Sequence, residues 1–349
     1  MQPSRVPVVG MGGIPRMPTK VARARKWIEL GKAVPKWSKL GIFYVQLTVE
    51  AGTEKQNMVL GLDPGSKFDG VAIVTEKDVL QTGMLELPKG ITKRMGQRKR
   101  HRRARRFIKC RRRPCRFSNR KKPKGWLAPS QRAKVEFRLK IIGELKELYP
   151  ITQVVVEDVR FDHYKKRWGK YFSTVEIGKM KVYEELALWF KHLKLVSGAK
   201  TAALRAQYNV KKCSDKRKRV VESHAIDALV IAAEEGGLKE FVVPSFYVWK
   251  RYQYPRRQLH KFQFVKGGFR RREGGSNSLN GFKKGDVVLY KDGLARVGGY
   301  RNGRISLHTF DVENRRFTQR ANPSECIRVF NQRIIYAAIH PLRLSMELH

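Results

Sequence analysis

The chain has 349 residues, of which 41% are hydrophobic, so it can bury a core and is too apolar to be a disordered basic tail. Its 75 lysines and arginines against 30 acidic residues give a formal net charge of +45, and a surface this positive calls for a polyanionic partner. Nucleic acid is the first candidate, and an anionic membrane surface is the rival.

Membrane insertion and structural zinc are both disfavoured. No apolar stretch approaches the roughly 18 residues of a spanning helix, and we expect no signal peptide. The four cysteines, Cys110, Cys115, Cys213 and Cys326, do not form the two close pairs of a zinc ribbon. We therefore expect a cytoplasmic protein with reduced thiols and no membrane partner.

The first predicted elements follow a segment that contains Pro and Gly and has a basic, helix-like patch at residues 19–32. Residues 58–63 predict a buried strand that ends at Asp63, before Pro64 and Gly65. Residues 70–74 predict a second strand after a short turn, so we expect a hairpin. A weaker third strand is expected at 79–87.

A strongly basic segment comes next. No acidic residue lies between Glu86 and Glu136, and residues 94–124 carry 17 lysines and arginines. An isolated helix of this charge repels itself, so we expect order there only when phosphates surround it. The alternative is a disordered, nonspecific polycation, although apolar side chains such as Phe107 and Phe117 could dock it.

The remaining pattern predicts an α/β protein with a mixed-sheet core. Residues 135–148 have helical spacing and stop before a proline, and residues 151–156 form a β-branched strand that leads into Glu157. Residues 176–195 predict a helix, closed by a short strand at 195–196, and residues 222–234 predict a strongly apolar helix. The glycine- and asparagine-punctuated stretch at 281–330 predicts a small β-barrel or SH3-like module.

Four residues at the boundaries of these apolar elements are our candidate catalytic and metal-binding residues. Asp63 and Glu157 each end a hydrophobic strand, and open α/β sheets place their sites at the carboxyl ends of strands. If the two strands are adjacent and parallel, the two carboxylates come side by side. His224 and Asp227 are three residues apart and share the polar face of a predicted helix.

Clustered carboxylates raise one another's pKa, and a divalent cation relieves that repulsion. Oxygen ligands select Mg²⁺ or Mn²⁺ over zinc. We expect two ions, about 4 Å apart, that activate a water and stabilise the leaving 3′ oxygen in phosphodiester hydrolysis. His224 would orient or deprotonate this water. Each residue also has an ordinary alternative, because Asp63 could form a turn, Glu157 could be a strand-end charge, and His224 and Asp227 could be solvated helix residues.

Three segments resemble the three RuvC segments of RNase H-like nucleases. They read Gly-Leu-Asp-Pro-Gly-Ser-Lys at 61–67, Val-Val-Val-Glu-Asp at 154–158 and Ser-His-Ala-Ile-Asp-Ala at 223–228. The arginine run between the first two resembles the bridge helix of RNA-guided Cas nucleases. The resemblance implies an RNase H-like (RuvC) mixed-sheet core, an arginine-rich bridge helix, a small N-terminal domain and a C-terminal small β-barrel module. It also implies that Asp63, Glu157, His224 and Asp227 form the catalytic set.

The ends of the chain resemble transposon-encoded IscB proteins. Ile-Pro-Arg-Met-Pro-Thr at 14–19, followed by a basic stretch at 22–26, resembles their PLMP domain, although Arg16 stands where that motif has Leu. Residues 254–260 and 281–288 resemble their C-terminal part. The resemblance therefore spans nearly the whole chain.

One feature of IscB is missing from this sequence. IscB inserts an HNH nuclease between its second and third RuvC segments, whereas here only 67 positions separate Glu157 from His224. The histidines between them, His163 and His192, show no ββα-metal pattern. The chain is therefore similar to IsrB, the HNH-less relative.

This resemblance implies an RNA-guided DNA nickase. A guide RNA (ωRNA) would pair with the target strand of double-stranded DNA beside a target-adjacent motif, and the RuvC site would nick the displaced strand. The protein is expected to be a monomer within the ribonucleoprotein. The implied nucleic-acid-binding residues are Arg94, Arg98, Lys99, Arg100, Arg102, Arg103, Arg105, Arg106, Arg111, Arg112, Arg113, Arg256 and Arg257.

The resemblance also sets the expected domain boundaries. The expected divisions are 1–55 for the PLMP-like domain, 56–92 for RuvC segment I, 93–125 for the bridge helix and basic linker, 126–195 for segment II, 196–240 for segment III and 241–349 for the C-terminal region that contacts RNA and the adjacent motif. Two other functions stay open. One is a RuvC-like resolvase or transposase that acts without RNA, and the other is a catalytically inert RNA-binding protein whose carboxylates are structural.

Overall fold

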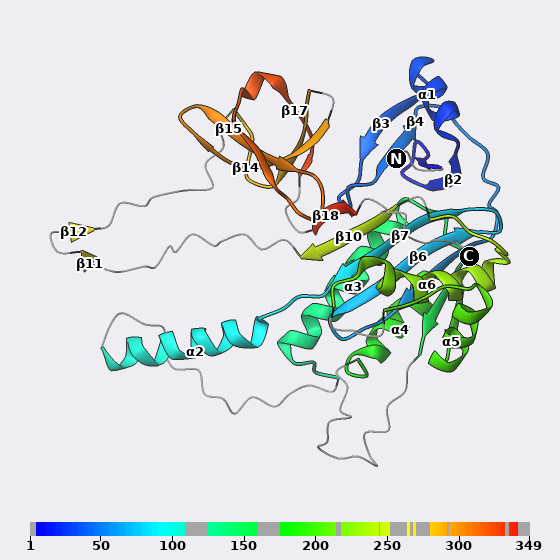
Figure 1. The fold of residues 1–349 in the computed structure, drawn as a ribbon, viewed down its shortest axis with the longest axis horizontal. Coiled ribbons are helices and arrows are strands. Elements are labelled where there is room, and N and C mark those ends of the chain that lie inside the picture. The colour runs from blue at the N-terminus through cyan, green and yellow to red at the C-terminus, as the bar shows by residue number, and fades with distance from the viewer. Residues whose placement is uncertain are drawn as a thin grey trace, which may run out of the picture.

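The computed structural model describes residues 5–108, 125–158, 175–213, 218–243, 245–251, 264–265, 268–269, 280–291, 293–331 and 335–340. Within these ranges a central seven-stranded sheet lies beside a four-stranded N-terminal sheet and a five-stranded C-terminal sheet (Figure 1). No helix in the described part of the chain is long and apolar enough to cross a membrane.

The N-terminal sheet has a small core of its own. Its elements are β1 (Val6–Val9), β2 (Pro15–Thr19), α1 (Val21–Glu29), β3 (Ala33–Trp37) and β4 (Phe43–Leu47). The strand order is β2-β1-β4-β3. The helix-like patch expected at 19–32 is α1, which buries Ala24 and packs Trp27 and Ile28 against the sheet.

The central sheet is mixed, as the order of predicted elements indicated. Its strands are β5 (Met58–Asp63), β6 (Phe68–Thr75), β7 (Val79–Glu86), β8 (Gln153–Glu157), β9 (His192–Val196), β10 (Phe246–Arg251) and β18 (Ile335–His340). Their order is β18-β10-β7-β6-β5-β8-β9. β5 and β6 form the expected hairpin and β7, the weaker third strand, extends it antiparallel, whereas β8 pairs parallel to β5 and β9 parallel to β8.

Helices cover both faces of this sheet. They are α3 (Pro129–Lys146), α4 (Lys179–Trp189), α5 (Gly198–Gln207) and α6 (Val221–Gly236). α3 and α4 share one core with alternate residues of β5, such as Leu60 and Leu62, whereas α5 and α6 share a second core with Val59. Successive side chains of a strand point to opposite faces, so Asp63 lies on the α6 face.

The helix predicted at 176–195 is wrong in its C-terminal part. α4 ends at Trp189, Phe190 has extended backbone angles, and β9 begins at His192. β9 pairs along its whole length with β8, from Gln153 to Glu157. Local helical spacing is therefore overridden by hydrogen bonding to a neighbouring strand.

The C-terminal strands divide between two sheets. The five-stranded antiparallel sheet has the order β16-β15-β14-β13-β17. Its strands are β13 (Asp286–Tyr290), β14 (Gly293–Arg301), β15 (Arg304–Thr309), β16 (Arg316–Ala321) and β17 (Cys326–Asn331), with a short helix η1 (Pro323–Glu325). β10 and β18, which flank this sheet in the sequence, instead extend the central sheet beside β7. Among the described strands, β11 (Phe264–Val265) and β12 (Gly268–Phe269) pair only with each other.

The basic segment begins as a long exposed helix, α2 (Ile91–Phe107). It buries none of its residues and projects away from the central sheet (Figure 1). The basic residues that follow, from 109 to 124, lie outside the described residues.

Candidate metal centre

Two carboxylates meet at the carboxyl edge of the central sheet. Leu62 of β5 is in register with Val156 of β8 in a parallel pair, so the next residues, Asp63 and Glu157, end neighbouring strands side by side. Val59 and Val155 pack into the α6 core, and the alternation of side chains places both carboxylates on that same face. The juxtaposition expected from the two apolar strands is therefore present.

α6 supplies a third carboxylate. Asp227 is buried, with 3% of its surface exposed, on the helix that packs over β5 and β6. One carboxylate oxygen from each of Asp63, Glu157 and Asp227 lies within 4.8 Å of the others. Three residues that are far apart in the sequence thus converge on one small volume.

The electrostatics of this cluster follow from its composition. Burial raises the pKa of Asp63 well above its usual value, and a hydrogen bond to Glu157 and the negative charges of Glu157 and Asp227 raise it further, whereas Lys212 acts in the opposite direction. Close carboxylates share protons or bind cations because their ionised forms repel.

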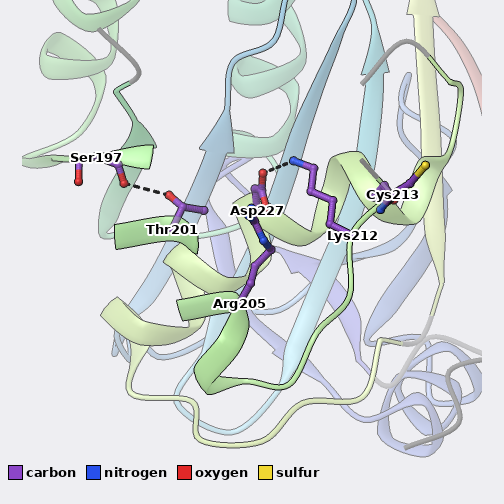
Figure 2. Close-up of polar contacts among 7 residues, drawn as sticks. Ser197, Thr201, Arg205, Lys212, Cys213 and Asp227 are labelled. Carbon is purple, nitrogen blue, oxygen red and sulfur yellow. Dashed lines mark hydrogen bonds and ion pairs between the residues drawn. The ribbon is translucent and has the colours of Figure 1, made fainter. Parts of the chain in front are cut away.

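Two cations, from α5 and from the loop before α6, converge on Asp227 (Figure 2). Arg205 Nη1 donates to Asp227 Oδ1 at 2.5 Å, and Lys212 Nζ contacts Asp227 Oδ2. Arg205 lies near the end of α5, and Lys212 lies in the loop that leads to α6. Both contacts hold the Asp227 carboxylate in place and neutralise part of the charge of the cluster.

His224 stands one helical turn before Asp227 but lies outside the three-carboxylate group. Its Nε2 is 3.0 Å from the carbonyl oxygen of Lys218, and its ring packs at 4.6 Å from the ring of Phe68. Burial lowers the pKa of His224, although the Lys218 carbonyl opposes the shift. The structure thus brings together three of the four candidate residues, and the role of His224 stays a prediction.

A buried ion pair anchors the turn that follows Asp63. Asp69, in β6, is fully buried and accepts two hydrogen bonds from Arg138 of α3, at 2.7 and 2.8 Å. The same carboxylate accepts a hydrogen bond from the backbone N–H of Gly65 at 2.8 Å. Lys134 of α3 donates to the carbonyl oxygen of Ser66 at 2.6 Å. These bonds fix the path of the chain directly after Asp63.

The carboxylate beside Glu157 has a different environment. Asp158 Oδ1 lies 2.6 Å from Lys179 Nζ and accepts a hydrogen bond from the Tyr183 hydroxyl at 2.9 Å. Its backbone N–H donates to the carbonyl oxygen of Val196. Asp158 therefore ties the end of β8 to α4 and β9, which steadies Glu157.

Sequence reasoning missed Arg205, Lys212, Asp69 and Arg138. A carboxylate inside an otherwise apolar strand was a usable signal for Asp69, because such a group needs a buried partner. The cations at Asp227 gave no signal, because they stand among many lysines and arginines whose partners depend on the tertiary fold.

The expected nucleic-acid-binding residues fall into two groups. Those that the structure describes lie on α2 with exposed side chains, and Arg94 donates to the carbonyl oxygen of Lys89 at 3.1 Å. Those of α2 are Arg94, Arg98, Lys99, Arg100, Arg102, Arg103, Arg105 and Arg106. The others lie outside the described residues, namely Arg111, Arg112, Arg113, Arg256 and Arg257.

The donor set suits a hard divalent cation. Asp63, Glu157 and Asp227 offer only oxygen atoms, which Mg²⁺ and Mn²⁺ prefer, and no cysteine stands in the group. A spacing within 4.8 Å lets several carboxylates contact the same ion or a pair of ions. The geometry therefore fits a metal centre of the kind expected from the sequence.

Comparison with known proteins adds a family match. Residues 6–177 match the family model of the RRXRR proteins. The pattern itself stands at 102–106, where α2 reads Arg-Arg-Ala-Arg-Arg. The matched region includes Asp63 and Glu157 and stops before Asp227. A search of curated proteins found no match.

Two solved structures of one protein are similar to part of this chain. The RuvC of T. thermophilus in complex with a Holliday junction substrate has 15% sequence identity and a TM-score of 0.31, over 52% of this chain and 98% of that chain. The Thermus thermophilus RuvC structure has 15% identity and a TM-score of 0.28, over 50% and 90% of the two chains. The strand order β7-β6-β5-β8-β9, with β6 antiparallel to its neighbours, is consistent with the RNase H-like mixed-sheet core expected from the sequence.

Proposed function

We propose that this chain is an RNA-guided, divalent-metal-dependent DNA endonuclease that nicks one strand. The observation that carries the proposal is the meeting of Asp63, Glu157 and Asp227 within 4.8 Å at the carboxyl edge of a mixed sheet. Carboxylates that only form turns or face solvent are not expected to converge from two strands and a helix. If the three carboxylates were purely structural, their mutual repulsion would destabilise the fold and no bound ion would offset it.

Asp63, Glu157 and Asp227 would hold the ions, which we take to be two Mg²⁺ or Mn²⁺. When bound, such ions supply an acidified water and neutralise charge on the leaving oxygen. Arg205 keeps Asp227 oriented toward the other two carboxylates, and Lys212 contacts its second oxygen. His224 is proposed to orient or deprotonate the attacking water, as its place one turn from Asp227 allows.

The basic surface supports a nucleic-acid substrate. α2 carries a dense row of exposed cations and buries none of its residues, so this row is available to a polyanion. Phosphate contacts of this kind position nucleic acid without reading its sequence. Base pairing with a guide RNA would then supply the specificity that the protein surface lacks.

The match to the RRXRR family model and the resemblance to IsrB favour a guide RNA over an RNA-independent mechanism. We propose that the protein binds ωRNA as a monomer in a cytoplasmic ribonucleoprotein and engages double-stranded DNA beside a target-adjacent motif. The C-terminal region, 241–349, would contact the RNA and that motif, and the N-terminal region, 1–55, would form the PLMP-like domain. A single hydrolytic centre cuts one strand in each engagement, which predicts a nick in the displaced strand.

The test begins with sequencing the RNA that co-purifies with the full chain. That RNA is then combined with the protein, Mg²⁺ and a supercoiled plasmid whose target matches the guide and is flanked by randomised sequence. The expected product is the open circle, dependent on RNA, and Asp63→Asn should abolish it while binding persists. Equal cutting by RNA-free protein would favour the resolvase or transposase. Mainly linear DNA at early times would contradict nicking, and an inert wild-type protein that binds RNA would favour the structural alternative.

A further inference from the structure

A second charged feature lies on the same edge and face of the central sheet as the carboxylates. A cavity of about 330 Å³ opens where β7 and β10 end, and its lining includes Glu86, Lys89, Lys250, Arg251 and Tyr336. Lys250 is in register with Glu86 across the parallel pair of β7 and β10. Lys250 is also opposite Tyr336 across the pair of β10 and β18. The walls are therefore regular strand ends whose positions the sheet fixes.

Cations outnumber carboxylates in this cavity. Among the described residues that line it, Glu86 alone is acidic, and it is already engaged by Lys89 at 2.9 Å and by Arg219 at 3.2 Å. Lys250 and Arg251 add two further positive charges to the same walls. A surplus of cations around a partly enclosed space costs free energy that an anionic ligand would offset.

The position of Lys250 is particularly constrained. Its Nζ lies 4.0 Å from the centre of the Tyr336 ring, and the guanidinium of Arg296 lies 3.9 Å from the same ring. The hydroxyl of Tyr336 is held by Arg296 Nη1 at 2.6 Å. Burial lowers the pKa of Lys250, and the nearby charge of Arg219 lowers it further, although Glu86 opposes the shift. The ammonium group is thus preorganised in a place where its charge is incompletely compensated.

The cavity and the metal centre share one side of the sheet. Along this edge the order is β10, β7, β6, β5 and β8, so the end of β7 lies two strands from Asp63 and the end of β10 lies three strands away. At the usual spacing of about 4.8 Å between strands, the cavity is roughly 10–15 Å from Asp63. Met84 and Val248 pack into the core beneath α6, so strand alternation places Glu86 and Lys250 on the Asp63 face.

The segment from the cavity to the basic helix is short. Lys89 lines the cavity, Gly90 follows in a left-handed conformation, and α2 begins at Ile91. Lys89 Nζ also lies 4.9 Å from the ring centre of Phe68, the residue that packs against His224. The cavity is therefore linked to α2 through Lys89 and Gly90, and to the neighbourhood of His224 through Phe68.

We propose that this cavity binds one backbone phosphodiester of the DNA strand that is cut, with Lys89, Lys250 and Arg251 as its cationic ligands. It would fix the strand within a few nucleotides of the scissile bond and so set where the cut falls. The identity of that strand rests on the proposed nuclease function, whereas recognition of a phosphodiester rests on the cavity alone. These three residues are binding residues and not catalytic ones, because none of them belongs to the cluster of Asp63, Glu157 and Asp227.

The test uses the full chain with Asp63→Asn, so that the probe is bound and not cut. The probe is a fluorescein-labelled 20-nucleotide single-stranded DNA, measured by anisotropy over a series of KCl concentrations. Lys250→Met should weaken binding and reduce the slope of log K against log salt by about 0.7, the value for one phosphate contact on a single strand. Arg251→Ala should have the same effect on affinity and slope. Because Arg251 is exposed, this second variant keeps the test valid even if Lys250→Met disturbs the fold.

The matched control is Lys77→Met, because Lys77 is exposed in the turn between β6 and β7 at the opposite edge of the sheet. It should leave both affinity and slope unchanged. A series of probes with one neutral methylphosphonate linkage at each position then locates the contact. One or two linkages should weaken binding to the parent protein several-fold and have no effect on the Lys250→Met variant.

The phosphate site and the nuclease function can be disproved independently of each other. If Lys250→Met and Arg251→Ala keep the parent slope and the parent methylphosphonate pattern, the phosphate site is overturned, even if the wild-type chain nicks DNA. If the slope and the pattern change as expected and no cleavage occurs with any RNA, the phosphate site stands and the nuclease assignment falls. In a cleaving wild-type background, Lys250→Met should raise KM more than it lowers kcat and should spread the cut over neighbouring positions.

Discussion

Gly61 of β5 lies against the carbonyl oxygen of Ala228 in α6 so closely that a Cβ on Gly61 would be 2.0 Å from that oxygen. The neighbouring strand repeats this arrangement, because a Cβ on Gly70 of β6 would be 1.9 Å from the carbonyl oxygen of His224. Two glycines in adjacent strands thus allow α6 to rest directly on the backbone of the sheet. This close approach brings Asp227 to the carboxylates at the strand ends.

We therefore expect Gly61→Ala to disrupt the metal centre. The clash is with backbone atoms, which cannot rotate away, so α6 must shift outward at a cost of about 1–3 kcal/mol or more. Denaturant unfolding should show the loss of stability, and metal-dependent nicking should fall more steeply than nucleic-acid binding. Gly299→Ala is the control, because a Cβ there meets nothing within 4 Å. Equal stability and activity in both variants would show that α6 does not depend on this contact.

The carboxylate cluster should make the metal-free protein less stable as the pH rises. Because the pKa of Asp63 is raised in the folded protein, the folded state holds this proton more tightly than the unfolded chain does. Above the ordinary aspartate pKa of about 3.9 the unfolded chain ionises first, so this residue reduces the free energy of unfolding increasingly with pH. Asp63→Asn should therefore raise Tm at neutral pH, by about 2–4 °C for each kcal/mol of repulsion removed.

The same variant also tests metal binding. In thermal melts from pH 4 to 8 in EDTA, the advantage of Asp63→Asn over wild type should shrink toward pH 4. Mg²⁺ or Mn²⁺ binds the folded state, so at about 100 times its Kd it should stabilise wild type by about 2.7 kcal/mol and the variant much less. A pH-independent difference between the two proteins would contradict the inferred repulsion.

Much of the core could be predicted because its strands carry their own signal. The apolar runs that end at Asp63 and Glu157 predicted two strands, and their parallel pairing is confirmed by the register of Leu62 with Val156. The convergence of Asp227 could not be derived from spacing, because it depends on how closely α6 approaches the sheet. Gly61 and Gly70 are the sequence signal for that close approach, but a glycine in a strand can also mark a bulge or a bend.

Other features depend on contacts that no local pattern records. β10 and β18 belong to the central sheet, although they flank the five-stranded sheet in the sequence. Helical spacing at 176–195 hid β9, whose residues are held by pairing with β8. Pairing between distant segments is decided by tertiary context, and a window of ten residues does not contain it.

The buried pair of Asp69 and Arg138 should be among the costliest polar contacts to break. Arg138→Met leaves a fully buried carboxylate without its cation, which costs about 3–5 kcal/mol. The loss also loosens Gly65, so nicking should fall in addition to stability. In a double-mutant cycle, Asp69→Asn combined with Arg138→Met should cost less than the sum of the two single changes.

The control for that cycle lies on the same helix. Arg132 of α3 pairs with Glu136 at 2.6 Å, but its side chain is 72% exposed. Exposed pairs contribute less than about 1 kcal/mol, so Arg132→Met should leave the urea midpoint nearly unchanged. A similar loss in both variants would mean that α3 is sensitive to any arginine replacement, and the special role of Asp69 would have to be abandoned.

Lys212 should compete with the metal for Asp227. Its ammonium group contacts Oδ2 of that carboxylate, and a divalent ion that binds there must displace it. Removing the charge in Lys212→Met should lower the Mg²⁺ concentration that gives half-maximal nicking by roughly 3- to 10-fold, corresponding to about 0.7–1.4 kcal/mol. Turnover at saturating Mg²⁺ should stay within about twofold of wild type, a difference of about 0.4 kcal/mol.

The matched change is Lys200→Met, on α5, where the ammonium group lies 3.9 Å from Glu234 and outside the carboxylate cluster. It should leave the Mg²⁺ titration unchanged, which separates a local effect from the loss of one positive charge among many. If Lys212→Met instead raises the Mg²⁺ requirement, Lys212 serves to orient Asp227 for the ion. Lys212→Arg keeps a cation at Oδ2 and should give the wild-type titration whichever role Lys212 has. The direction of the shift in Lys212→Met therefore decides between the two roles.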